Sequence, residues 1–268
     1  MTATRWLPVL LCALAATACG EGEPGDLALA PKPKGDILGD GLRLSQINDP
    51  SLPRPVDGSE VNVTGISVLA VDSFDETGDG ASVGNIYAQD LPIQGAPPPY
   101  GGITLFGSSF NPPTLRVAPG DVVDVRGAYE EFPGPPSSLF DPGETLPEIV
   151  SGALRLRFEH VVPEPITIPL SDLASYATGR KWIGMLVRVE NVSAQSDGFK
   201  SSSGRFSVRL DVPGTADSDL PTINNALNDI ESAPVSFAAG TKYASVVGVV
   251  QYFFNFAIGP RSAADITP

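Results

Sequence analysis

The chain has 268 residues, a formal net charge of −14 and 42% hydrophobic residues. This length is enough for one large or two small domains, and the hydrophobic fraction excludes general disorder despite 28 glycines and 27 prolines. Residues 41–170 carry 17 acidic and 6 basic side chains, whereas residues 171–268 carry 9 and 8. The first segment should therefore repel a phosphate backbone, and only the second can host a basic patch.

Residues 1–18 are predicted to form a lipoprotein signal peptide. Arg5 supplies the positive charge, and Trp6 to Ala16 form an apolar stretch that is too short for a stable bilayer anchor. Ala16-Thr17-Ala18-Cys19 resembles the bacterial lipobox, although alanine stands where leucine is usual. The alternative is an ordinary signal peptide with a chance cysteine.

Acylation of Cys19 would anchor the mature protein through its lipid chains. Gly20 follows the cysteine, and the absence of aspartate there permits export to the outer membrane or cell surface. The only other cysteine, Cys12, lies inside the leader, so the mature chain would hold no disulfide. Residues 19–40 are rich in Gly, Pro and charge and read as a flexible tether.

Residues 41–165 are predicted to form a first β-barrel that opens with a hairpin over Val61–Asp90. Apolar residues alternate with polar ones from Val61, and the phase slips at Gly65, as at a bend or bulge. The strands expected in this unit are Val61 onward, Asn85–Asp90, Gly102–Phe106, Asp121–Tyr129 and Leu154–Phe158 with an extension to Val162. In the last strand, Leu154, Leu156 and Phe158 are expected on the packed face, since arginines alternate with them.

Residues 166–268 are predicted to form a second β-barrel. Ser171 is expected to cap a short helix that ends before Gly179. Residues 182–192 are expected to pair with residues 204–211 across a polar turn, and two more strands are expected over 243–252 and 255–266. Residues 220–231 are expected to be helical, because Ile223, Leu227 and Ile230 have helical spacing.

A weak internal repeat supports two related barrels over one sandwich. Val63-Thr-Gly65, Val125-Arg-Gly127 and Val246-Val-Gly248 each place glycine after a β-branched residue within a strand. Small barrels need strongly coiled strands, and glycine lets a strand turn a corner.

The segments VNVTGISVLAVDS, NIYAQD, DVVDVRGAYEEF, GMLVRVENV and NFAIGPRSAADI resemble the OB-fold modules of bacterial secreted proteins. Such modules occur in tandem in extracellular lipoproteins and beside endonuclease/exonuclease/phosphatase domains. The resemblance implies an all-β chain of two small OB-like antiparallel barrels with short helices. The nuclease signature of the family is absent from this sequence, so the resemblance implies an accessory module without its enzyme.

The sequence offers no catalytic motif. His160 is the only histidine and sits at the end of a predicted strand, where a surface or hydrogen-bonded histidine is expected. GxSxG, P-loop and HExxH motifs are absent. A carboxylate pair for glycoside chemistry stays open, because 31 acidic residues leave many combinations.

The acidic turn after the first strand resembles the start of an EF-hand loop. Asp75, Thr77 and Asp79 alternate before Gly80, and such oxygen ligands suit calcium. The position of the closing glutamate holds Ile86, so a site here would be partial. The alternative is a plain polar loop, and no other cofactor is predicted.

Arg205 and Arg209 share one face of a predicted strand with Ser207 and are candidate ligand-binding residues. Phe206 alternates in phase with the apolar residues Val208 and Leu210, so its side chain is expected on the core side of the strand. The aromatic cluster Tyr252, Phe253, Phe254 and Phe256 is expected to be mostly packing, with only some rings exposed.

The sequence thus predicts a non-enzymatic lipoprotein that displays tandem barrels for binding or assembly at the cell surface. Its expected partners are the membrane, through the lipid anchor, and an envelope protein or polymer, and the acidic balance argues against nucleic acid. Two alternatives remain: a nucleic-acid or polysaccharide-binding accessory module, and a hydrolase with an unrecognised carboxylate site.

Overall fold

The computed structural model describes residues 41–268, except for residues 74–83, 93–94, 111–112 and 203. These residues form two β-sheets joined by short helices, so the all-β prediction is confirmed. The predicted signal peptide and the tether up to residue 40 lie outside the described residues.

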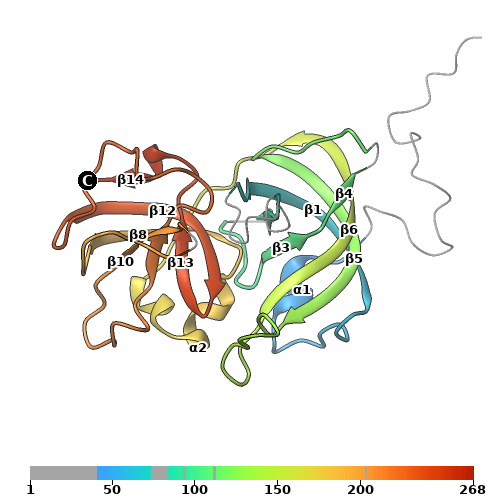
Figure 1. Cartoon of the computed structure of the whole chain (residues 1–268). Helices are drawn as coiled ribbons and strands as arrows, with labels where there is room; N and C mark the ends of the chain where they lie inside the picture. Colours follow the sequence, from blue (N-terminus) through green and yellow to red (C-terminus); the bar gives the residue numbers. More distant parts are fainter. Residues whose placement is uncertain (1–40, 74–83, 93–94, 111–112, 203) are drawn as a thin grey trace, which may run out of the picture. The chain divides into compact units, whose positions relative to one another are not determined.

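The first sheet is built from six strands: β1 (Glu60–Val71), β2 (Ile86–Asp90), β3 (Gly102–Phe106), β4 (Ser109–Phe110), β5 (Asp121–Phe132) and β6 (Leu146–His160). Their order is β3-β2-β1-β5-β6-β4, and β3 also pairs in parallel with β6. The long strands β5 and β6 run side by side in Figure 1 and pair over most of their length.

The predicted opening hairpin is confirmed, since β1 and β2 pair antiparallel. The expected break in phase is present as well. The register of β1 against β5 shifts between Val63 and Ile66, and Gly65 between them has φ +64°. Glycine adopts this left-handed conformation without steric cost, so the strand can bend there.

Strand β6 differs from its prediction at both ends. It begins at Leu146, eight residues before the predicted start at Leu154. Leu154 is buried as expected, but Phe158 is 78% exposed, so its predicted packing is wrong. Phe158 has φ +58°, and this left-handed residue breaks the two-residue alternation that the prediction assumed.

The second sheet contains eight strands: β7 (Ile166–Thr167), β8 (Leu186–Ser193), β9 (Phe199–Lys200), β10 (Phe206–Arg209), β11 (Thr222–Asn224), β12 (Lys242–Phe253), β13 (Asn255–Gly259) and β14 (Ile266–Thr267). Their order is β7-β8-β12-β13-β11-β10-β9, with β14 on β12. Strands β11 and β13 pair in parallel.

Two local predictions for this half are wrong. Strand β8 pairs with β12, and the expected long hairpin is reduced to a bridge between Ala194 and Leu210, the residues that directly follow β8 and β10. The helix expected over residues 220–231 is absent, since Thr222–Asn224 is β11. Ile223 is fully buried between its neighbouring strands, and this burial outweighs the helical spacing.

The helices are short: α1 (Leu44–Asn48), η1 (Leu170–Ala174), α2 (Tyr176–Gly179), η2 (Arg180–Trp182) and η3 (Ala263–Asp265). Ser171 is not an N-cap, because η1 begins after Pro169, whose ring fixes the backbone angle at the helix entrance. Gly179 is the last residue of α2 and does not follow its end as predicted. A Cβ atom at this position would lie 2.4 Å from the ring of Phe256.

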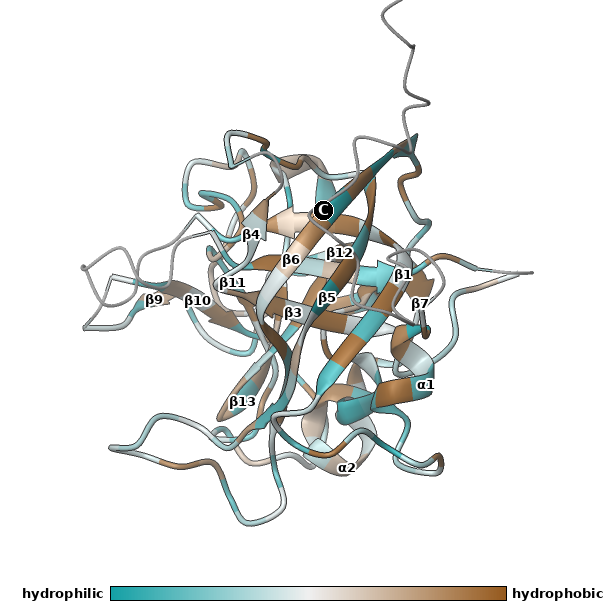
Figure 2. Cartoon of the chain, turned by 90° about the vertical axis from the view of Figure 1, so that its right-hand side faces the viewer, coloured by the Kyte–Doolittle hydropathy of each residue, from teal (hydrophilic) through white to brown (hydrophobic). Residues whose placement is uncertain are grey.

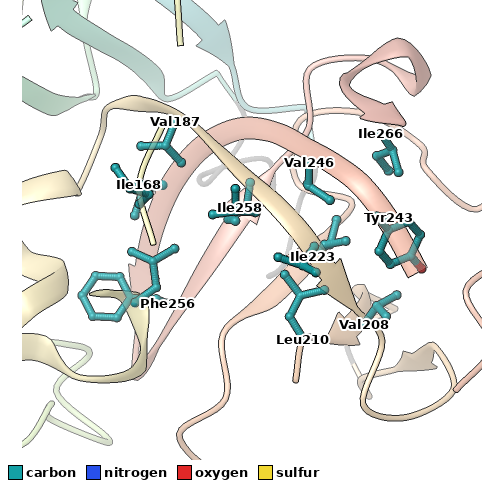
Figure 3. Close-up of a cluster of buried hydrophobic side chains, with 14 of the residues drawn as sticks. Ile168, Val187, Val208, Leu210, Ile223, Tyr243, Val246, Phe256, Ile258 and Ile266 are labelled. Carbon is teal, nitrogen blue, oxygen red and sulfur yellow. The ribbon is translucent and has the colours of Figure 1, made fainter. Parts of the chain in front are cut away.

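Each sheet encloses its own hydrophobic core. Figure 2 shows hydrophobic and hydrophilic residues alternating along strands such as β1, and the apolar face of the first sheet supplies residues including Val63, Ile103 and Ile149. The core of the second sheet, drawn in Figure 3, brings together side chains from β7, β8 and β10–β14. Phe140, from the loop between β5 and β6, packs into this second core against Tyr252 at a ring-centroid distance of 5.2 Å.

The two sheets also contact each other. A small apolar cluster joins Leu69 and Ala70 of β1 to Leu186, Val247 and Val249 of the second sheet. The side-chain oxygen of Gln89 accepts a hydrogen bond from the backbone of Leu186 at 2.8 Å. The backbones approach so closely at Gly102 that a Cβ there would lie 2.3 Å from the carbonyl oxygen of Ile183. These contacts fix the walls of the candidate site.

Candidate ligand pocket

A cavity of about 570 Å³ is lined by strands of both sheets. Residues of β2, β3, β5 and β6 form one wall, and residues of β10–β13, together with Arg205 just before β10, form the other. Small-molecule sites typically occupy about 300–1,000 Å³ and combine apolar walls with a few placed polar groups. The size of this cavity therefore suits a small organic ligand.

Four polar side chains form a continuous row across the wall made by the first sheet. The strand registers pair Tyr87 with Thr104, Thr104 with Glu148, and Glu148 with Glu130. All four line the cavity, whereas chain neighbours such as Ile103 and Tyr129 belong to the first core. The two-residue period of a strand separates these faces.

Glu148 is the most unusual member of this row. It is only 8% exposed, and it lines the cavity next to a second carboxylate, that of Glu130. Burial raises its pKa to about 7, and repulsion from Glu130 adds to the rise. At neutral pH the side chain is therefore divided between its ionised and protonated forms.

Two further polar groups reach into the cavity. The Oγ1 atom of Thr104, a residue only 3% exposed, has no hydrogen-bond partner within the described part of the chain. On the facing wall, Gln251 accepts a 2.8 Å hydrogen bond from Asn224 through Oε1. Its Nε2 makes no hydrogen bond of normal geometry to a described residue. The Gln251 amide nevertheless lies close enough to the Tyr87 hydroxyl to lower the pKa of that phenol slightly against the effect of burial.

Aromatic and aliphatic side chains complete the cavity. Phe106 of β3 lies beside Val150 of β6, and Phe132 of β5 lies beside Leu146. Phe253 lines the opposite wall and is 49% exposed. A ligand with an apolar body could therefore pack here while its polar atoms meet the row on β2, β3, β5 and β6.

The charge lining the cavity is mostly negative. Asp72, Glu130 and Glu148 carry carboxylates, and Arg205 is the one cationic residue among the described lining residues. Burial raises the pKa of the Tyr87 phenol, and Asp72 raises it further while Arg205 opposes the rise. This arrangement favours neutral or cationic ligands over polyanions such as nucleic acid.

The structure places one of the two predicted ligand-binding arginines in the cavity. Arg205 lines it, whereas the guanidinium of Arg209 lies over the ring of Phe199, 4.7 Å from the centroid. Phe206 packs against the second core, which confirms its predicted side of the strand. The aromatic cluster divides as expected, since Tyr252 and Phe256 are buried while its two other rings are partly exposed.

Other candidate residues lie elsewhere. Cys19 and the calcium candidates Asp75, Thr77 and Asp79 are outside the described residues. Within the described part of the chain, no group of three potential metal ligands forms a site. His160 is a surface residue at the end of β6, as expected, with Nδ1 3.9 Å from the carboxylate of Asp121. Among the helices that the structure describes, none has the length and hydrophobicity needed to cross a membrane.

Local sequence patterns give no strong signal for Glu148, Thr104 or Gln251. The signal for Glu148 is weak: an acidic residue directly precedes the β-branched pair Ile149-Val150. That segment lies before the predicted start of its strand at Leu154, so the pairing of Glu148 with Glu130 was not predicted. Gln251 lies in a predicted strand, but only the folded chain brings this strand opposite the first sheet, where Gln251 lines the cavity.

The sequence matches no protein-family model, and no curated protein matches it. The cavity and the predicted lipid anchor are therefore the features that bear on function.

Proposed function

We propose that this protein is a non-catalytic bacterial lipoprotein of the outer membrane or cell surface that binds a small ligand between two OB-like barrels. The observation that carries the proposal is the cavity, in which the Thr104 hydroxyl is buried without a hydrogen-bond partner among the described residues and lies beside the largely buried Glu148. Buried polar groups in native proteins are nearly always satisfied. A ligand that supplies the missing hydrogen bonds accounts for their retention.

The strand pairings support two barrels related by duplication. In the first half, successive pairings run β1-β2-β3-β6-β5 and return to β1, and β3 and β6 are parallel. In the second half, β8-β10-β11-β13-β12 follows the same order, with β11 and β13 parallel and the β8–β10 contact reduced to one bridge. Five strands in this order suit the partly open Greek-key barrel of an OB-fold, with domains over residues 41–165 and 166–268.

The position of the cavity agrees with such a fold. OB-folds bind oligosaccharides and oligonucleotides on the face of their second and third strands. Here those strands are β2 and β3 in the first half and β10 and β11 in the second, and all four contribute lining residues. The two binding faces therefore converge on one ligand.

The anchor is the second part of the proposal. Acylated Cys19 would hold the protein at the bilayer, and residues 19–40 would act as a flexible spacer with a typical span of about 25 Å. The pocket would then sample ligands near the cell surface without entering the lipid.

A pocket-blocking variant tests the binding function. Full-length acylated protein in lipid nanodiscs is screened by ligand-observed NMR against a fragment library with neutral, cationic and anionic members. Ala257 is 8% exposed and lies between Thr222 and Gln251 in the cavity wall, so Ala257→Trp should abolish binding of the fragments that the wild type retains. The matched control Ala239→Trp is on an exposed loop and should leave binding unchanged. The proposal would be contradicted if no fragment bound the wild type, or if the Ala257→Trp variant bound the same fragments as the wild type.

The adjacent carboxylates favour one second candidate, a glycoside hydrolase that acts on an envelope polysaccharide. Glu148 has the raised pKa of a general acid, and Glu130 is its direct neighbour across β5 and β6. Release of reducing ends from purified envelope polysaccharide, lost in both Glu148→Gln and Glu130→Gln, would establish this activity. A retained polysaccharide that is not cleaved would instead support the accessory-module alternative.

A further inference from the structure

We propose that the ligand of this pocket is a small organic amine whose ammonium group contacts Glu148, Glu130 and Thr104. This inference rests on the proposed binding function and adds the chemical class of the ligand. It depends on three features of the cavity: a row of acceptors, the sign of the charge and the aromatic walls.

The acceptor row has the spacing that one ammonium group needs. Thr104, Glu148 and Glu130 are consecutive cross-strand partners on β3, β6 and β5. Side chains directly opposite each other in an antiparallel pair such as β5 and β6 have Cβ atoms about 4.5–5.5 Å apart, and neighbouring strands of any sheet lie about 4.7–4.9 Å apart. An ammonium carries three N–H donors, so one nitrogen can donate to both carboxylates and to the threonine hydroxyl at the same time.

The charges of the ionisable side chains that line the cavity also favour a cationic ligand. Glu148 faces Glu130 from β5 and Tyr87 from β2, and Asp72 and Arg205 complete the charged lining among the described residues. Repulsion between two neighbouring carboxylates in a partly desolvated site is relieved by a bound cation and increased by a bound anion. The raised pKa of Glu148 agrees with this unmet demand for positive charge.

The remaining walls define the body of the ligand. Phe106, Phe132 and Phe253 offer aromatic surface, which packs against apolar groups and attracts an ammonium that passes over a ring. On the facing wall, Gln251 Nε2 is a donor that could meet an oxygen acceptor of the ligand. The cavity of about 570 Å³ has room for an amine with an aromatic or aliphatic body.

A matched pair of probes tests this inference. Binding of 2-phenylethylamine and 2-phenylethanol to full-length acylated protein in nanodiscs is measured by isothermal titration calorimetry at pH 6 and pH 8. Only ionised Glu148 pairs with the ammonium, and with its pKa at about 7 the ionised fraction rises roughly tenfold over this range. The amine is therefore expected to bind about tenfold more tightly at pH 8 than at pH 6, and more tightly than the alcohol at pH 8.

Glu148→Gln keeps the shape of the side chain and removes its charge, so this variant should lose both the preference for the amine and its pH dependence. Glu164→Gln, at an exposed position, should retain both. Thermal unfolding at each pH checks that every variant is folded. Equal binding of the alcohol and the amine by the wild type, or a preference that Glu148→Gln retains, would overturn the amine inference and leave the binding function in place. Failure of both probes to bind would overturn the amine inference, and the fragment screen would then decide the binding function separately. Probe binding that survives Ala257→Trp would overturn the inference and the proposed function together.

Discussion

Arg180 donates hydrogen bonds to both carboxylate oxygens of Glu131, at 2.9 and 3.2 Å, and thereby ties the segment before β8 to strand β5. The side chains of Arg180 and Glu131 are only 10% and 18% exposed. Burial alone would raise the pKa of Glu131, but Arg180 and hydrogen bonds donated by Thr145 and Tyr129 outweigh it, so the pKa is lowered. The ion pair is therefore a structural link between the two halves.

Arg180→Met should lower the free energy of unfolding by about 2–4 kcal/mol, because it leaves a largely buried carboxylate without its main partner. Urea unfolding followed by circular dichroism measures the change. Arg54 provides the control: its Nη1 also lies 2.9 Å from Glu131, but the side chain is 41% exposed. Arg54→Met should therefore reduce stability by less than about 1 kcal/mol. Equal losses in the two variants would show that burial does not set the strength of this contact.

Glu148→Gln should make the protein more stable at pH 8. The pKa of Glu148 is about 7 in the folded protein, above its ordinary value of 4.5, so the folded state binds the proton more tightly than the unfolded state. This contribution to stability is fully present below about pH 4.5 and is lost as the pH rises through about 7.

The variant lacks this pH dependence, so its free energy of unfolding at pH 8 should exceed that of the wild type by up to about 3 kcal/mol. This figure is the difference between the two pKa values multiplied by 1.36 kcal/mol per pKa unit. Urea unfolding without ligand at pH 5, 6, 7 and 8 measures it. A difference between the two proteins that stays constant from pH 5 to pH 8 would contradict the assigned titration.

Gly102→Ala should weaken the contact between the two sheets. The added Cβ would lie 2.3 Å from the carbonyl oxygen of Ile183 and 2.6 Å from the amide nitrogen of Met185, and backbone atoms cannot move aside easily. The expected loss is about 3 kcal/mol, measured by chemical denaturation. Gly143→Ala meets no atom within 4 Å but has φ +91°, so it should cost only about 1–2 kcal/mol of backbone strain. A smaller effect at Gly102 than at Gly143 would show that the two backbones can separate freely.

Cys19→Ala should release the protein from the membrane fraction and abolish labelling by radioactive palmitate, because the proposed lipid anchor depends on this thiol. Cys12→Ala is the matched control and should remain labelled, since it changes a residue of the proposed leader. Palmitate incorporation by the Cys19→Ala protein would contradict the proposed anchor.

Calcium removal tests the acidic turn. If Asp75, Thr77 and Asp79 bind calcium, then EGTA should lower the melting temperature and excess calcium should restore it. Asp75→Asn combined with Asp79→Asn should remove this response, whereas Glu164→Gln, at an exposed position outside the turn, should keep it. Identical melting curves of the wild type with calcium and with EGTA would exclude the site.

The sequence by itself determined the features that depend on near neighbours along the chain. Alternation placed Gly102–Phe106 in a strand with correct bounds, the phase slip located the bend at Gly65, and parity placed Phe206 on the core side of β10. Each of these follows from the two-residue period of a strand or from the conformational freedom of glycine, which act within a few residues.

Only the tertiary structure decided which strands pair and which polar groups lose water. Ile223 has helical spacing with Leu227, but it lies in a strand because β10 and β13 cover it on both sides. Glu148 and Gln251 stand 103 positions apart and line one cavity because two sheets with separate cores meet there. Burial and long-range pairing depend on the whole fold, so the chemistry of the pocket could not be found from local patterns.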